Sequence, residues 1–200
     1  MVLRPGGASR ARPRTGLNGV LFVRHATSAG MRDARFPADP AADASGLARA
    51  WALAGSLPDG DAWSSPARAA RETCAALGLD ARTEAALAEA DHGRWAGVRY
   101  AQVARDEPDA LASWLADPHA VPHGGESRAA FAARVAAWLG TGPSGIAVCD
   151  AGVIRAALGH ALGIAVPAAD RIDVAPLSTT RLTAARDGWR VAHVNRKVLD

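Results

Sequence analysis

The sequence predicts one α/β domain, a three-layer sandwich in which a mostly parallel sheet carries helices on both faces. Its length of 200 residues suits a single domain with a sizeable core. Short apolar runs typical of buried strands alternate along the chain with segments of helical periodicity. Hydrophobic residues make up 49% and charged residues 22%, which is typical of globular proteins rather than disordered ones.

Strand and helix signals alternate in the N-terminal half. A four-residue apolar run at 20–23 predicts the first strand. Residues 47–54 place apolar side chains on one helical face, and we expect Trp51 on that face to be part of the core. Residues 69–77 predict the next helix, with Gly78 as its C-terminal stop.

The C-terminal half continues the alternation. Residues 131–139 predict a helix, and the apolar run at 146–149 predicts a second buried strand that leads into a helical stretch at 153–162. Residues 179–183 and 189–194 flank a turn and predict a hairpin. Between the halves we expect a smaller helical insertion spanning roughly residues 90–130.

Two strand ends carry polar side chains. Arg24 and His25 follow the first predicted strand, and Asp150 follows the later one. Ligands of parallel sheets bind beyond the carboxyl ends of the strands. We therefore expect His25 and Asp150 to belong to one site.

The N-terminal segment differs in composition from the rest. Residues 1–17 are rich in Arg, Pro, Gly and Ala, which predicts a flexible basic tail before a single domain at 18–200. Much of the net charge of +3 lies in this tail, so the body is close to neutral and nucleic-acid binding is not indicated. No apolar run is long enough to span a bilayer or to form a signal peptide, and two cysteines do not make a disulfide framework. A cytoplasmic protein without a membrane partner is expected.

Six short segments, taken in order, resemble the histidine phosphatase superfamily of phosphoglycerate-mutase-like proteins, over residues 19–196. They are Leu21-Phe22-Val23-Arg24-His25-Ala26-Thr27; Ser64-Ser65-Pro66 with Arg71-Glu72-Thr73; Leu87-Ala88-Glu89 with Gly93-Arg94-Trp95-Ala96-Gly97; Pro122-His123-Gly124-Gly125-Glu126-Ser127; Val148-Cys149-Asp150-Ala151-Gly152-Val153-Ile154-Arg155; and Pro176-Leu177-Ser178 with Asn195. One segment alone is weak evidence, but six in the family's order are specific.

The resemblance implies a phosphomonoester hydrolase acting on a small molecule, without cofactor or metal. It implies that His25 attacks the phosphoryl group, that Arg24 holds the phosphate and that Glu89 protonates the leaving alcohol. A phosphoryl group in transfer carries negative charge, so the family surrounds it with arginines and histidines. Further candidate substrate-binding residues in or beside the matching segments are Thr27, Arg68, Arg71, His92 and Trp95.

Two pocket positions depart from the family pattern. Ala69 stands where the family has its second phosphate-binding arginine, and Asp150 stands where it has its second histidine. Two like charges at close range repel by about 4 kcal/mol even at an intermediate dielectric. Each lost donor commonly lowers the rate by about 100- to 1000-fold. We therefore expect lost or repurposed phosphatase chemistry, with His25, Glu89 and Asp150 as an acid–base cluster.

Alternatives stay open. The chain could be a working phosphomonoesterase with a phospho-His25 intermediate, if Arg68 or Arg71 occupies the vacant arginine place. It could also be a non-catalytic binding protein, with its pocket closed by an Arg24–Asp150 ion pair. Asp150 could instead cap the following helix. No metal site is expected at Asp117, His119 and His123, because prolines interrupt their spacing and no further ligand completes the set.

Overall fold

The computed structural model describes residues 17–198, and it confirms the predicted α/β sandwich. The sheet has six strands in the order β3-β2-β4-β1-β5-β6. The first four in the sequence are parallel and the last two run antiparallel as a hairpin. The strands are β1 (Gly19–Arg24), β2 (Asp61–Ser64), β3 (Arg82–Thr83), β4 (Gly145–Cys149), β5 (Thr179–Ala185) and β6 (Gly188–Arg196).

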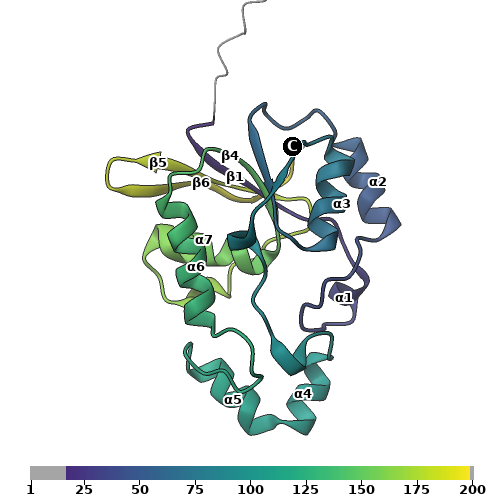
Figure 1. Cartoon of the computed structure of the whole chain (residues 1–200), viewed down its shortest axis with the longest axis vertical. Coiled ribbons are helices and arrows are strands. Elements are labelled where there is room, and N and C mark those ends of the chain that lie inside the picture. Colours follow the sequence, from purple (N-terminus) through teal and green to yellow (C-terminus); the bar gives the residue numbers. More distant parts are fainter. Residues whose placement is uncertain (1–16, 199–200) are drawn as a thin grey trace, which may run out of the picture.

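Helices cover both faces of the sheet (Figure 1). Two 3₁₀ turns, η1 and η2, also occur among the described residues. The helical elements are α1 (Ala29–Arg32), α2 (Ala44–Ala52), α3 (Arg68–Leu77), η1 (Ala85–Leu87), η2 (Gly93–Trp95), α4 (Tyr100–Asp106), α5 (Pro108–Ala116), α6 (Arg128–Gly140), α7 (Ala151–Leu162) and α8 (Val166–Ala169). One core cluster joins the sheet to α6 and α7, and another joins it to α2 and α3.

The two central strands divide their side chains between these clusters. In β1, Val20 and Phe22 face the α6–α7 cluster, whereas Leu21 and Val23 face the α2–α3 cluster. Successive side chains of a strand point to opposite faces, so a continuous apolar run is what a strand covered on both sides requires. β4 is buried along its whole length in the same way. The apolar runs at 20–23 and 146–149 thus specify the two innermost strands.

The helix boundaries follow local capping chemistry. α3 ends at Gly78, whose φ of 73° is left-handed, as the sequence predicted. Ser127 caps α6 by accepting a hydrogen bond from the amide of Ala130. The expectation for Trp51 is wrong: its side chain is 67% exposed, because α2 buries only the narrow stripe that contains Gly46 and Ala50.

The predicted insertion forms a satellite of the main core. α4 and α5 lie together beyond the sheet, at the bottom of Figure 1. Phe36, Trp95, Val103 and Leu111 form a small apolar cluster there. This cluster fixes the segment that covers the carboxyl ends of β1 and β4, and so the insertion supplies one wall of the site.

The predicted basic tail falls mainly on residues 1–16, which lie outside the described residues. Leu17, at the boundary of that prediction, is buried and packs in the α2–α3 cluster. Within residues 17–198, no helix has the length and apolar character needed to cross a membrane.

Candidate active site

A cavity of about 1030 Å³ opens beyond the carboxyl ends of β1 and β4. Arg24 and His25 enter it from the end of β1, Asp150 from the end of β4, and Glu89 from the segment after η1. The insertion closes the opposite side through residues such as Trp114. The structure thus brings His25 and Asp150 into one site, at the place that the strand ends indicated.

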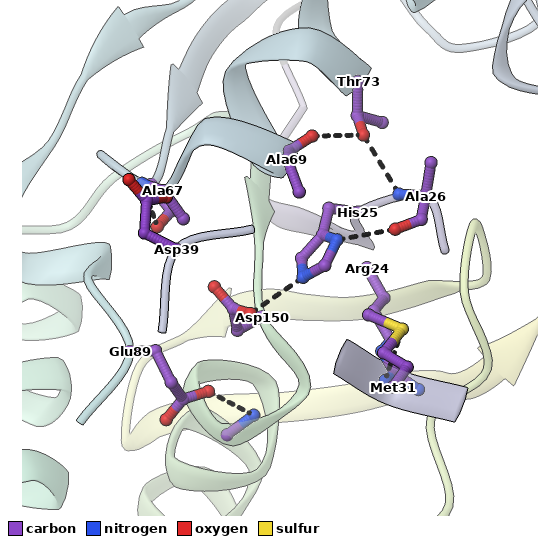
Figure 2. Close-up of polar contacts among 12 residues, drawn as sticks. Arg24, His25, Ala26, Met31, Asp39, Ala67, Ala69, Thr73, Glu89 and Asp150 are labelled. Carbon is purple, nitrogen blue, oxygen red and sulfur yellow. Dashed lines mark hydrogen bonds and ion pairs between the residues drawn. The ribbon is translucent and has the colours of Figure 1, made fainter. Parts of the chain in front are cut away.

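His25 is bonded at both ring nitrogens (Figure 2). Its Nδ1 lies 2.7 Å from the carbonyl oxygen of Ala26, and its Nε2 lies 2.8 Å from Oδ1 of Asp150. The side chain is almost fully buried, and burial alone would lower its pKa. The hydrogen bond and charge of Asp150 outweigh burial and raise the pKa of His25 above its ordinary value.

These contacts limit the protonation states of the ring. A carbonyl oxygen only accepts, so Nδ1 carries a proton, and an ionised Asp150 favours a second proton on Nε2. With both protons the ring is an imidazolium. An imidazolium has no free lone pair, so in this state His25 is an acid and not a nucleophile.

Asp150 occupies the position before α7 but does not cap it. Its side chain makes no capping hydrogen bond. One oxygen contacts His25, and the other, Oδ2, is buried without a hydrogen-bond partner. No ion pair joins Asp150 to Arg24 within residues 17–198. Arg24 instead donates to the carbonyl of Val174 and, at 3.4 Å, to the sulfur of Met31.

Ala69 lines the cavity from the first turn of α3 and presents only a methyl group there. Figure 2 shows Ala69 and Asp150 near the ring of His25. The hydroxyl of Thr73 donates to the carbonyl of Ala69 at 2.6 Å and accepts from the amide of Ala26 at 3.0 Å. These two hydrogen bonds join α3 to the loop after His25. They therefore fix the position of Ala69, where the resemblance predicts an arginine, relative to His25.

Neither neighbouring arginine fills that place. Arg68 is 59% exposed and its Nε donates to Glu72 at 2.8 Å, one turn further along α3. Arg71 is exposed, and neither side chain lines the cavity. On a helix, positions one or two residues from Ala69 point in other directions, which explains this outcome.

Glu89 lies against the first turn of α7. Its two oxygens accept hydrogen bonds from the amides of Ala90, at 2.9 Å, and Gly152, at 3.1 Å. Burial and, secondarily, the charge of Asp150 raise the pKa of Glu89 to about 7. Glu89 can therefore both accept and donate a proton at neutral pH, as a general acid–base group must.

Gly152→Ala should displace Glu89 without unfolding the protein. A Cβ at position 152 would lie 2.3 and 2.4 Å from the carboxylate oxygens of Glu89, whose flexible side chain must move away. We expect the pKa of Glu89, followed by NMR of its carboxyl carbon, to fall towards its ordinary value as it becomes solvated. Gly159→Ala is the control, because a Cβ there makes only ordinary contacts. An unchanged titration of Glu89 in Gly152→Ala would contradict this geometry.

The other sequence-predicted residues divide into two groups. His92 lines the cavity, with its Nδ1 buried and unpartnered, and burial and His123 lower its pKa to about 4, so it is neutral. Trp95 is buried in the insertion cluster, and its Nε1 donates to Glu107. Thr27 accepts from Arg49. The structure therefore places Trp95 and Thr27 away from the cavity surface.

Sequence reasoning missed several lining residues. Arg155 lines the cavity from α7, and its Nε donates to the carbonyl of Ile172. Asp39 and Asp91 add two further carboxylates. No sequence signal marks these loop acids, since their position depends on how the insertion folds over the sheet. Within residues 17–198, no group of three or more His, Cys, Asp or Glu side chains is placed to hold a metal.

The fold and the site together define a phosphoglycerate-mutase-like protein with a histidine at the end of its first strand. The chain belongs to the histidine phosphatase superfamily (branch 1), whose family model matches residues 20–197. The predicted resemblance to this superfamily is thereby confirmed.

Comparison with individual proteins identifies mycobacterial relatives. The chain is 41% identical over 75 residues to glucosyl-3-phosphoglycerate phosphatase of Mycobacterium tuberculosis, a match that covers 36% of this chain and 34% of that protein. The match thus spans about a third of the length of this curated relative. A solved structure of the mycobacterial enzyme in complex with VO3 superposes with a TM-score of 0.74 at 27% identity, covering 90% of this chain and 100% of that one. A structure from Thermus thermophilus matches with a TM-score of 0.71 at 29% identity, covering 88% of this chain and 96% of that one.

Proposed function

We propose that this member of the superfamily has lost efficient phosphoryl transfer through His25 and uses its cavity for acid–base catalysis on a small molecule. The observation that carries the proposal is the 2.8 Å contact between Nε2 of His25 and Oδ1 of Asp150. It occupies the ring nitrogen that faces the cavity, and it places a negative charge where a phosphate would have to bind.

Electrostatics argue against a phosphate dianion in this cavity. Asp150 and Glu89 contribute carboxyl groups, and Ala69 contributes no charge in the place of an arginine. A dianion beside a carboxylate meets repulsion of about 4 kcal/mol per pair of charges at an intermediate dielectric. A neutral or cationic substrate avoids this cost, and it can donate a hydrogen bond to the unpartnered Oδ2 of Asp150.

The three titratable groups suit proton transfer. The imidazolium of His25 can donate its Nε2 proton to a substrate atom that replaces Oδ1 of Asp150 as the acceptor, while the bond from Nδ1 to Ala26 holds the ring in position. Glu89, with a pKa of about 7, can take a proton from one substrate atom while His25 protonates another. A dehydration, an isomerisation or a hydrolysis would each use such a pair. The two cysteines, buried and unpaired, support a reducing compartment such as the cytoplasm for this activity.

The second candidate is a working phosphomonoesterase with an unusual pocket. The relatives favour it, because a curated protein 41% identical over 75 residues is named glucosyl-3-phosphoglycerate phosphatase. The retained Arg24, His25 and Glu89 are compatible with it. A non-catalytic binding protein is less well supported, because the cavity is open and Arg24 does not pair with Asp150.

A phosphate-release assay separates these candidates. The full-length protein is incubated with a panel of phosphomonoesters that includes glucosyl-3-phosphoglycerate, beside the His25→Ala variant. We expect turnover far below the roughly 1–1000 s⁻¹ of ordinary enzymes, and no further loss in the variant. Turnover within that range that disappears in His25→Ala, with a phosphohistidine seen by phosphorus-31 NMR, would refute our proposal and establish the phosphatase.

A further inference from the structure

A second cavity, of about 630 Å³, lies between α5, α6, α7 and α8, on the other side of the segment that carries Glu89. Most of the residues that line it do not line the cavity at His25 and Asp150, which we call the catalytic cavity. The two share a partition formed by Glu89, Ala90, His92, Trp114, Gly152 and Arg155. Its volume lies within the range of about 300–1,000 Å³ typical of small-molecule sites.

The walls of this second cavity are mainly apolar, and small side chains from α6 and α7 line the part between these two helices. α6 contributes Ala132 and Ala136, and α7 contributes Ala156 and Gly159. Where the two helices face the cavity they therefore leave space instead of filling it. Leu115 and Ile164 lie on the same wall and are 47% and 37% exposed, which leaves apolar surface open to solvent at its mouth.

Arg128 is a buried charged side chain in this lining, which also includes Glu89, Arg155 and Asp170. Its side chain is 9% exposed, its Nη1 pairs with Asp170 at 2.9 Å, and its Nη2 donates to the carbonyl of Leu115 at 2.9 Å. Its guanidinium lies 5.1 Å from the ring centre of Trp114. Nε alone is buried without a partner. The charge of Arg128 is thus balanced, while one N–H donor remains available to an acceptor.

We propose that the second cavity binds an uncharged apolar chain or ring that carries one hydrogen-bond acceptor, which accepts a hydrogen bond from Nε of Arg128. Because the partition is shared with the catalytic cavity, the apolar portion of a substrate can lie here while its reacting end reaches Glu89. Only this link to the substrate rests on the proposed function. Binding itself follows from the cavity and Arg128.

Fluorescence of N-phenyl-1-naphthylamine, with competition by a series from 2-hexanone to 2-decanone, tests binding without any assay of turnover. Each ketone offers one carbonyl acceptor and an alkyl chain. We expect saturable displacement, with about fourfold tighter binding for each added methylene until the cavity is full. No saturable binding of the probe, or no dependence on chain length, would overturn the assignment.

Two tryptophan substitutions on neighbouring positions of α6 locate the site. Ala136 lines the cavity, whereas Ala137 is exposed and does not line it. Ala136→Trp should weaken ketone binding by at least about tenfold by filling the space, and Ala137→Trp should leave it unchanged. Thermal unfolding checks that both variants fold. Equal binding by the two variants would show that the ligand lies elsewhere.

This test is independent of the proposed function. Turnover of phosphomonoesters that depends on His25 would refute the proposed function but would leave the ketone-binding result intact.

Discussion

The double variant Ala69→Arg/Asp150→His is expected to gain phosphatase activity, with kcat/KM for phosphomonoesters rising at least about 10,000-fold above the unmodified protein. The two substitutions supply the arginine and the histidine that the sequence resemblance predicts at these positions. Ala69 is buried but lines the cavity, so an arginine there would extend from α3 into the cavity. A histidine at 150 removes the carboxylate that holds the imidazole of His25 as an acid.

The two single variants show how much of the gain in activity comes from each substitution. Each of Ala69→Arg and Asp150→His should give about 100-fold or more, since one preorganised donor is commonly worth 100- to 1000-fold. Asp150→Asn is the matched control, because it removes the negative charge without supplying a histidine, and it should gain less than Asp150→His. Adding His25→Ala to the double variant should abolish the gain. A folded double variant that is no more active than the original would show that other lining residues, such as Met31, prevent phosphate binding.

The sheet and the His25–Asp150 pair could be predicted because both depend on short-range patterns. A strand covered on both faces must be apolar at every position, and the residue after it must lie at the sheet edge. The runs 20–23 and 146–149 satisfy this rule, and they are neighbours in the sheet, with Arg24 paired to Cys149. Two adjacent strands therefore deliver His25 and Asp150 to one place without further information.

The rest of the site depends on tertiary packing that local patterns do not carry. Trp51 shares a helical face with apolar residues, but α2 is too narrowly covered to bury it. Trp95 was expected at the ligand because it lies in a segment that matches the family, yet it is buried in the apolar cluster of the insertion. The cavity acids Asp39 and Asp91 lie on loops whose course is set by that insertion. The contact of Glu89 with Gly152 joins segments 63 residues apart, which only the folded chain reveals.

The pKa values of His25 and Glu89, both raised in the folded protein, should both fall in the Asp150→Asn variant. Asp150 attracts the proton of His25 and repels the charge of Glu89, so it raises both values. Without that charge, burial and Arg24 remain, and we expect the pKa of His25 to drop below its ordinary value of 6.5. The pKa of Glu89 should fall below about 7, although burial still keeps it above its ordinary value of 4.5. Site-resolved NMR titration measures both. Asp91→Asn removes another cavity carboxylate, which does not contact His25, and should leave the His25 titration unchanged.

The same shifts fix the sign of the dependence of stability on pH. A histidine whose pKa is raised by folding contributes stability that is complete below its unfolded value of 6.5 and is lost as pH rises through its folded value. A carboxyl group whose pKa is raised by folding, such as Glu89, makes stability fall between pH 4.5 and about 7. Both groups therefore lower the free energy of unfolding as pH increases. Loss of the charge-assisted bond in Asp150→Asn should cost about 2 kcal/mol near pH 6, and the cost should shrink as the pH rises through the folded pKa of His25. Urea unfolding of both proteins from pH 5 to 9 measures the difference. A cost that is the same at both ends of that range would mean that His25 is neutral in the folded protein, and the imidazolium on which the proposed chemistry depends would not exist.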